Sequence, residues 1–164
     1  MRMFLSFLFF FFVSASFASA AEEIDNTSHL PLPRFASLRS DEVNMRAGPG
    51  LRYPIEWVYK RRGLPVEITA EYDIWRRVRD PEGTEGWVSK TELVGKRSAV
   101  VIGGKQDLRE DHNDEAVILA HLDEGAMGQI LSCKKEWCRV KFGGIKGYLR
   151  KTGFWGAYPE ELFD

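Results

Sequence analysis

The two cysteines, Cys133 and Cys138, are the residues whose type and spacing are best suited to chemistry. A redox-active pair has two intervening residues, whereas four separate these cysteines. A zinc site needs about four ligands, and the sequence places no further Cys or His cluster beside them. In an oxidising compartment, two nearby cysteines more often form a disulfide. We therefore predict a structural Cys133–Cys138 disulfide, with two buried free thiols as the alternative.

The other reactive residues do not indicate catalysis. The three histidines, His29, His112 and His121, pair with no cysteine or serine in a nucleophile arrangement. The acidic run from Asp107 to Glu115 lacks the residue order of a calcium loop and is typical of a solvated loop. We expect a protein that is not an enzyme, with no cofactor and no bound metal.

The N-terminus has the features of a secretion signal. Arg2 precedes an apolar stretch from Met3 to Val13, and Ala18-Ser19-Ala20 fits a cleavage site. An apolar stretch of about eleven residues is shorter than the roughly twenty that span a bilayer. We therefore predict a cleaved signal peptide over residues 1–20 rather than an uncleaved anchor. The mature chain would then be exported to the periplasm with no membrane span.

Charge and length limit the partners and the architecture. The chain carries 23 Lys and Arg against 24 Asp and Glu, a net charge of −1. A nucleic-acid-binding protein would be expected to show a clear basic excess, so nucleic acid is disfavoured as a partner. Removing 20 of the 164 residues leaves 144, enough for one medium domain or two small ones.

An internal repeat favours two small domains. At an offset of about 62 residues, Gly63 falls on Gly125 and Trp75 falls on Trp137, among other matches. Short alternating segments such as Val66–Ala70 predict half-buried antiparallel strands. The predicted fold class is therefore all-β, with two tandem small barrels of about five strands each. The predicted divisions are a linker over 21–38, barrels over 39–95 and 96–158, and a C-terminal tail over 159–164. The apolar segment from Phe154 to Phe163 is expected to pack back on a barrel, with a partner-binding motif as the alternative.

Each copy should contain a hairpin. In the first, residues 71–74 form the predicted turn between Val66–Ala70 and Trp75–Arg79. In the second, Gln129–Cys133 should pair with Trp137–Phe142, which brings the two cysteines within bridging distance if the register cooperates. The stretch from Ala116 to Leu122 could be helical, but a strand or one short turn is favoured.

The first copy carries a set of ordered motifs. It opens with Val43-Asn44-Met45-Arg46-Ala47-Gly48-Pro49-Gly50 and continues with Tyr53-Pro54-Ile55, Gly63-Leu64-Pro65-Val66, Trp75-Arg76-Arg77-Val78 and Gly86-Trp87-Val88. This order resembles the bacterial Src-homology-3-like domain family. The second copy is similar but degenerate, because Asp107–Asn113 replaces the glycine-proline loop and Tyr148 replaces the tryptophan. The resemblance implies Src-homology-3-like barrels in the cell envelope, often tied to peptidoglycan or to partner proteins.

The aromatic residues near the glycine-proline loop suggest a binding surface, because exposed rings stack on sugars or grip peptides. Trp75 and Trp137 occupy matching positions and are predicted to be core residues. Arg46 could either brace the loop or face a ligand. The candidate ligand-binding residues are Arg46, Pro49, Tyr53, Trp57, Tyr59 and Trp87.

These features together predict an exported, non-catalytic binding module of the bacterial cell envelope. Its expected partner is peptidoglycan, or an envelope protein or peptide, and the first copy is the favoured binding surface. The alternative is a structural or regulatory scaffold in which the two barrels pack together to bind a periplasmic protein.

Overall fold

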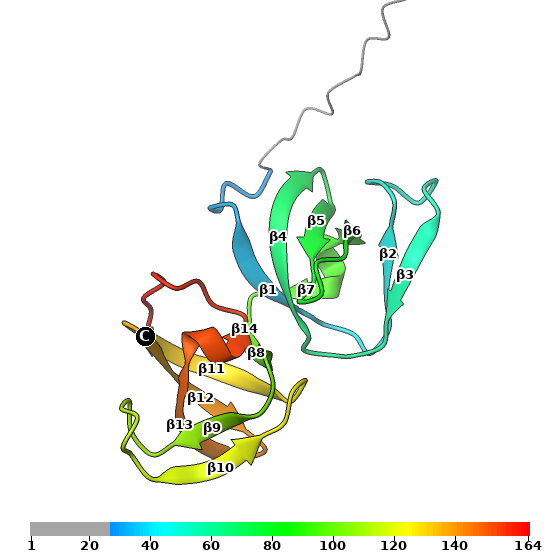
Figure 1. Ribbon diagram of the computed structural model, residues 1–164. Coiled ribbons are helices and arrows are strands. Elements are labelled where there is room, and N and C mark those ends of the chain that lie inside the picture. Colours follow the sequence, from blue (N-terminus) through cyan, green and yellow to red (C-terminus); the bar gives the residue numbers. More distant parts are fainter. Residues whose placement is uncertain (1–26) are drawn as a thin grey trace, which may run out of the picture.

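The structure is a computed structural model that describes residues 27–164, and these fold into two small β-barrels lying side by side (Figure 1). Barrel 1 comprises β1 (Arg34–Leu38), β2 (Val43–Arg46), β3 (Ile55–Tyr59), β4 (Pro65–Tyr72), β5 (Trp75–Arg79), β6 (Glu85–Ser89), the 3-10 helix η1 (Lys90–Glu92) and β7 (Leu93–Val94). Barrel 2 comprises β8 (Ser98–Val101), β9 (Gln106–Arg109), β10 (Ile118–Leu122), β11 (Met127–Lys134), β12 (Trp137–Phe142), β13 (Ile145–Arg150), the 3-10 helix η2 (Lys151–Gly153) and β14 (Phe154–Trp155). The predicted signal peptide lies outside the described residues.

The two barrels have the same topology. The strand order is β3-β2-β6-β5-β4-β1-β7 in barrel 1 and β10-β9-β13-β12-β11-β8-β14 in barrel 2. Each strand of one barrel therefore has a counterpart at the same place in the other. The predicted all-β fold of two tandem copies is confirmed, and residues 118–122 form a strand rather than a helix.

The predicted linker over residues 21–38 is wrong for its last five residues, which form strand β1. This strand lacks the alternation of polar and apolar residues because it is covered on two sides. Ala36 and Leu38 face the core of barrel 1. On the opposite side, the ring of Phe35 contacts Trp155 at 5.2 Å and Tyr158 at 4.7 Å between centroids.

Both hairpins form, and in each the turn contains two residues. Strand β4 continues to Tyr72, so the turn in barrel 1 is Asp73-Ile74 rather than residues 71–74. Asp73 adopts a positive φ of 48°, and Lys135 at the equivalent position has a φ of 49°. In barrel 2, Cys133 lies opposite Cys138, and the two form the predicted disulfide.

Contacts between named side chains join the barrels. The hydroxyl oxygens of Ser37 in β1 and Ser98 in β8 lie 2.5 Å apart. The hydroxyl of Tyr158 donates to the Glu67 carboxylate over 2.9 Å. The second barrel is therefore docked on strands β1 and β4 of the first. Within residues 27–164 the structure contains no helix with the length and apolar character needed to cross a membrane.

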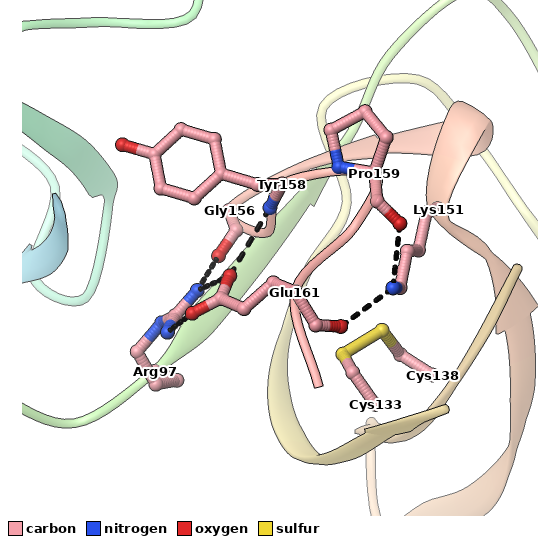
Figure 2. The surroundings of a disulfide bond; sticks show 8 residues. All are labelled: Arg97, Cys133, Cys138, Lys151, Gly156, Tyr158, Pro159 and Glu161. Carbon is pink, nitrogen blue, oxygen red and sulfur yellow. Dashed lines mark hydrogen bonds and ion pairs between the residues drawn. A yellow bond between two sulfur atoms is a disulfide. The ribbon is translucent and has the colours of Figure 1, made fainter. Parts of the chain in front are cut away.

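The C-terminal segment packs on barrel 2, as the sequence predicts (Figure 2). Arg97 forms an ion pair with Glu161 at 2.5 Å, and the Lys151 ammonium donates to the carbonyl oxygens of Pro159 and Glu161. The backbone of Phe163 exchanges hydrogen bonds with that of Cys133. These contacts tie the segment to the disulfide-bridged hairpin.

Candidate functional site

Arg46 supports the glycine-proline loop from within. Its guanidinium donates to the carbonyl oxygens of Tyr53 over 2.8 Å and Leu51 over 3.3 Å. Gly48 permits the Tyr53 ring to lie against the loop, because a Cβ at this position would sit 2.5 Å from that ring. Of the two roles open to Arg46, loop bracing is the one that its contacts support.

Two of the candidate binding residues lie in the core. Tyr59 is 5% exposed, and its hydroxyl donates to Asp80 over 3.2 Å. Burial, together with the Asp80 charge, raises the pKa of Tyr59 above its ordinary value. Trp87 is 9% exposed and packs with Trp75 and Ala70. The prediction of a ligand contact is wrong for Tyr59 and Trp87, because neither presents a free ring face.

The other aromatic candidates lie at the surface of barrel 1. Trp57 is 52% exposed, whereas Pro49 and Tyr53 are half-buried. Trp57 belongs to β3, which pairs only with β2 among the described strands. Strand β3 also exposes Ile55 and Val58, and the loop before it exposes Leu51. Barrel 1 therefore presents an apolar free edge rather than a ring of aromatic side chains around its loop.

In barrel 2, a cavity opens on the face equivalent to the predicted site. Arg46 pairs with Trp87 in barrel 1, and Arg109 pairs with Tyr148 in barrel 2, so the two faces correspond strand for strand. The cavity has a volume of about 770 Å³. Its lining residues are His112, Ser132, Lys134, Lys135, Glu136, Trp137, Arg139, Tyr148 and Asp164.

Strand geometry explains why these side chains meet. In β12, Trp137 and Arg139 lie two residues apart and share the outer face, while Cys138 and Val140 point into the core. Tyr148 is the cross-strand neighbour of Arg139. The Arg150 guanidinium covers the Trp137 ring at 4.6 Å from its centroid, and Trp137 is only 8% exposed, so it is buried as the sequence predicts.

Charge pairing on this outer face differs between the barrels. In barrel 1, Arg77 and Arg79 pair with Glu85 at 2.8 Å and 2.7 Å. The hydrogen bond from Arg79 lowers the pKa of Glu85. Lys146 occupies the place of Glu85 in barrel 2, opposite Lys141. Neither lysine forms an ion pair with any described residue.

Two cations that line the cavity are also unpaired. The side chains of Lys135 and Arg139 make no ion pair or hydrogen bond with residues in the described part of the chain. Other charges nearby are neutralised, because Arg150 binds both Asp114 and Glu136. The Arg150 hydrogen bond lowers the pKa of Asp114. Lys135 and Arg139 are therefore free to meet an anionic group on a ligand.

The sequence motifs do not indicate this cavity, because barrel 2 lacks the glycine-proline loop that marks a binding surface in barrel 1. A signal was present, since Glu85 aligns with Lys146 and removes the counter-charge from the equivalent face. Among residues 27–164, no three His, Cys, Asp or Glu residues gather in a way that could hold a metal ion. The lining side chains that a ligand can reach include the half-buried Tyr148 ring and the exposed cations Lys135 and Arg139.

Comparison with known families agrees with this architecture. The bacterial SH3 domain family matches residues 39–95 and 106–156, which together exceed half of the chain. The chain belongs to the bacterial SH3 domain family. The family consists of binding domains, and each match corresponds to one barrel of this bacterial SH3 protein. No curated protein matches it.

Two solved structures are similar to this bacterial SH3 protein. NlpC2 from Trichomonas vaginalis is 14% identical, with a TM-score of 0.37 over 79% of this chain and 50% of that chain. NlpC1 from Trichomonas vaginalis is also 14% identical, with a TM-score of 0.36 over 82% of this chain and 49% of that chain. This chain thus spans about half the length of these two proteins.

Proposed function

We propose that this protein is an exported, non-catalytic module of the bacterial cell envelope that binds peptidoglycan through the outer face of barrel 2. The observation that carries the proposal is the cavity in which Lys135 and Arg139, neither with a counter-charge among residues 27–164, adjoin the half-buried ring of Tyr148. The secretion signal in the sequence supports export.

Peptidoglycan offers chemistry that complements this cavity. Its amino-sugar rings have apolar faces that can pack on the Tyr148 ring, and its short peptides carry carboxylates. A carboxylate can accept a charge-assisted hydrogen bond from Arg139 or Lys135. Lys141 and Lys146 continue the positive charge along β12 and β13, where an extended polymer could follow the sheet.

Co-sedimentation with purified cell-wall sacculi tests the proposal. The Lys135→Gln, Arg139→Gln double variant should bind about tenfold more weakly than the wild type, because two charge-assisted contacts are lost. Lys60→Gln with Arg77→Gln removes the same charge from barrel 1 and is the matched control. Wild-type protein that stays in the supernatant at low and moderate salt would contradict wall binding, as would equal losses in both variants.

A second candidate function is capture of an envelope protein, and the free edge of β3 favours it. An extended segment of a partner can add to an exposed edge strand through backbone hydrogen bonds, while pockets or apolar side chains give specificity. Trp57, Ile55 and Leu51 would supply the apolar contacts, with Pro49 and Tyr53 beside them. This candidate predicts that Trp57→Ser abolishes retention of an envelope protein, whereas Lys135→Gln, Arg139→Gln does not.

A further inference from the structure

A second hollow lies between the barrels, away from the cavity on barrel 2. It has a volume of about 410 Å³ and is built from both domains. Barrel 1 and the segment that leaves it contribute Ser37, Leu38, Arg39, Arg62, Gly63, Val94 and Lys96, whereas barrel 2 contributes Ser98, Met127, Gly128 and Gln129. We call this hollow the inter-barrel cleft. None of its lining residues lines the cavity on barrel 2.

Hydrogen bonds at the domain boundary fix the positions of the cleft walls. Ser98 donates to the carbonyl oxygen of Gly63 over 2.6 Å, and Ser37 donates to that of Lys96 over 2.6 Å. Beside the cleft, Arg61 donates to the carbonyl oxygen of Gly125 over 2.5 Å. The walls are therefore fixed before any ligand arrives, which lowers the entropy cost of binding.

The charged residues that line the cleft are all positive. Its lining contains Arg39, Arg62 and Lys96 but no Asp or Glu, although the whole chain has a net charge of −1. Arg62 has a counter-ion in Asp41, which lies 3.5 Å away, and both side chains are largely exposed. Such an exposed pair contributes little and is readily exchanged. Three cations gathered at a domain boundary thus attract an anion.

Two of the lining side chains have unused hydrogen-bonding capacity. The Lys96 ammonium and the side-chain amide of Gln129 make no hydrogen bond with any residue in the described range. Between the polar groups, Leu38, Val94 and Met127 give the cleft an apolar surface. A ligand that fits this lining has an anionic group and an apolar part.

We propose that the inter-barrel cleft binds the carboxylate of a small amphipathic peptide. The carboxylate lies among Lys96, Arg62 and Arg39, and the Gln129 amide donates to a peptide carbonyl. The apolar side chains of the ligand rest on Leu38, Val94 and Met127. This site does not depend on wall binding by barrel 2, because the two sets of residues are separate.

Titration of the ¹⁵N-labelled protein with acetyl-leucyl-leucine, followed by NMR, tests the proposal. Saturable shifts are expected at the amides of Gly63, Lys96 and Gly128. The C-terminal amide of the same dipeptide, which lacks the charge, should bind about tenfold more weakly. Inorganic phosphate, which has the charge without the apolar part, should also bind more weakly than the acid.

Variants that reverse or remove one charge locate the site. Lys96→Glu and Arg62→Gln should each weaken binding about tenfold, since each removes one charge-assisted contact. Lys90→Glu makes the same charge change as Lys96→Glu on an exposed lysine outside both sites, and should leave the affinity unchanged. Preserved dispersion of the amide signals shows that each variant is folded.

Three results would overturn the proposal. One is equal binding of the acid and the amide, which would remove the role of the carboxylate. Another is equal saturation by phosphate, which would remove the role of the apolar surface. The third is an equal loss in Lys90→Glu, which would indicate diffuse charge attraction. Sacculi binding by the Lys96→Glu variant should remain at the wild-type level, so this result and the wall-binding test can fail separately.

Discussion

Barrel 1 and barrel 2 cross-link the same hairpin by different chemistry. In the β4–β5 hairpin, Glu71 lies opposite Arg76, and the two form an ion pair at 3.2 Å. In the β11–β12 hairpin, the equivalent positions are Cys133 and Cys138, which form the disulfide. All four residues are buried. The two copies therefore have a cross-link at the same position, ionic in barrel 1 and covalent in barrel 2.

The difference affects how the segment that flanks each barrel is held. The Glu71 carboxylate accepts hydrogen bonds from the Ser28 amide over 2.8 Å, the Ser28 hydroxyl over 2.6 Å and Arg34 over 2.5 Å. A disulfide has no comparable acceptor. In barrel 2 the C-terminal segment is instead held by Arg97 and Lys151. In barrel 1 the Glu71 carboxylate therefore both cross-links the hairpin and holds the flanking segment. In barrel 2 the disulfide cross-links the hairpin, while Arg97 and Lys151 hold the C-terminal segment.

The largest expected effect comes from removing the ionic cross-link. Glu71→Ala leaves the buried Arg76 guanidinium without its counter-charge, and should lower the free energy of unfolding by about 3–5 kcal/mol. Urea denaturation followed by tryptophan fluorescence measures this loss. Hydrogen exchange should show that the Ser28 amide loses its protection. An unchanged midpoint would contradict the role assigned to Glu71, whereas Glu92→Ala, at a half-buried acid of the same barrel, is the control.

The same cross-link gives barrel 1 a pH dependence. Burial alone would raise the pKa of Glu71, but hydrogen bonds from Ser28 and Arg34 and the Arg76 charge lower it from 4.5 to about 2. Because the folded pKa lies below the unfolded one, this stabilisation is complete above pH 4.5 and is lost as the pH falls towards 2. The difference in stability between wild type and Glu71→Gln should therefore shrink over this range.

A smaller effect is expected from the covalent cross-link. The disulfide closes a short loop, so Cys133→Ser with Cys138→Ser should cost about 2 kcal/mol by the loop-entropy estimate. The loss should be the same at pH 3 and pH 6, unlike that of Glu71→Gln. Urea denaturation at both pH values, with the reduced wild type alongside, measures it. A loss as large as that of Glu71→Ala would mean that the disulfide also holds the C-terminal segment.

The sequence predicted the parts of the fold that depend on local patterns. The repeat, both hairpins and the disulfide follow from spacing along the chain, and the structure confirms them. Strand β1 was missed because contacts from both sides remove its alternation. The Glu71–Arg76 pair was missed for a similar reason, since a charged residue in a strand is usually solvated and only the tertiary packing buries this pair.

The candidate site was predicted less well than the fold. The glycine-proline loop predicted a binding surface in barrel 1. Whether an aromatic ring there is exposed, however, depends on packing between strands that are distant in the sequence. Tyr59 and Trp87 are therefore core residues, while Trp57 is exposed. The positive charge beside the cavity in barrel 2 arises because the neighbouring strands supply no counter-charge. This can be recognised only when the strand pairing places Arg139 and Lys146 on one face.

The smallest effect tests whether the two barrels respond as one unit. Tyr158 in barrel 2 donates to Glu67 in barrel 1, and burial together with this hydrogen bond raises the pKa of Tyr158. Tyr158→Phe removes the hydroxyl but keeps the ring against Phe35, so the cost should be about 1 kcal/mol. If the interface couples the barrels, the lower free energy of unfolding affects both barrels, and calorimetry still shows a single transition. Two separate transitions in the wild type would show that the ionic and the covalent hairpins stabilise independent domains, and the inter-barrel cleft would then lack fixed walls.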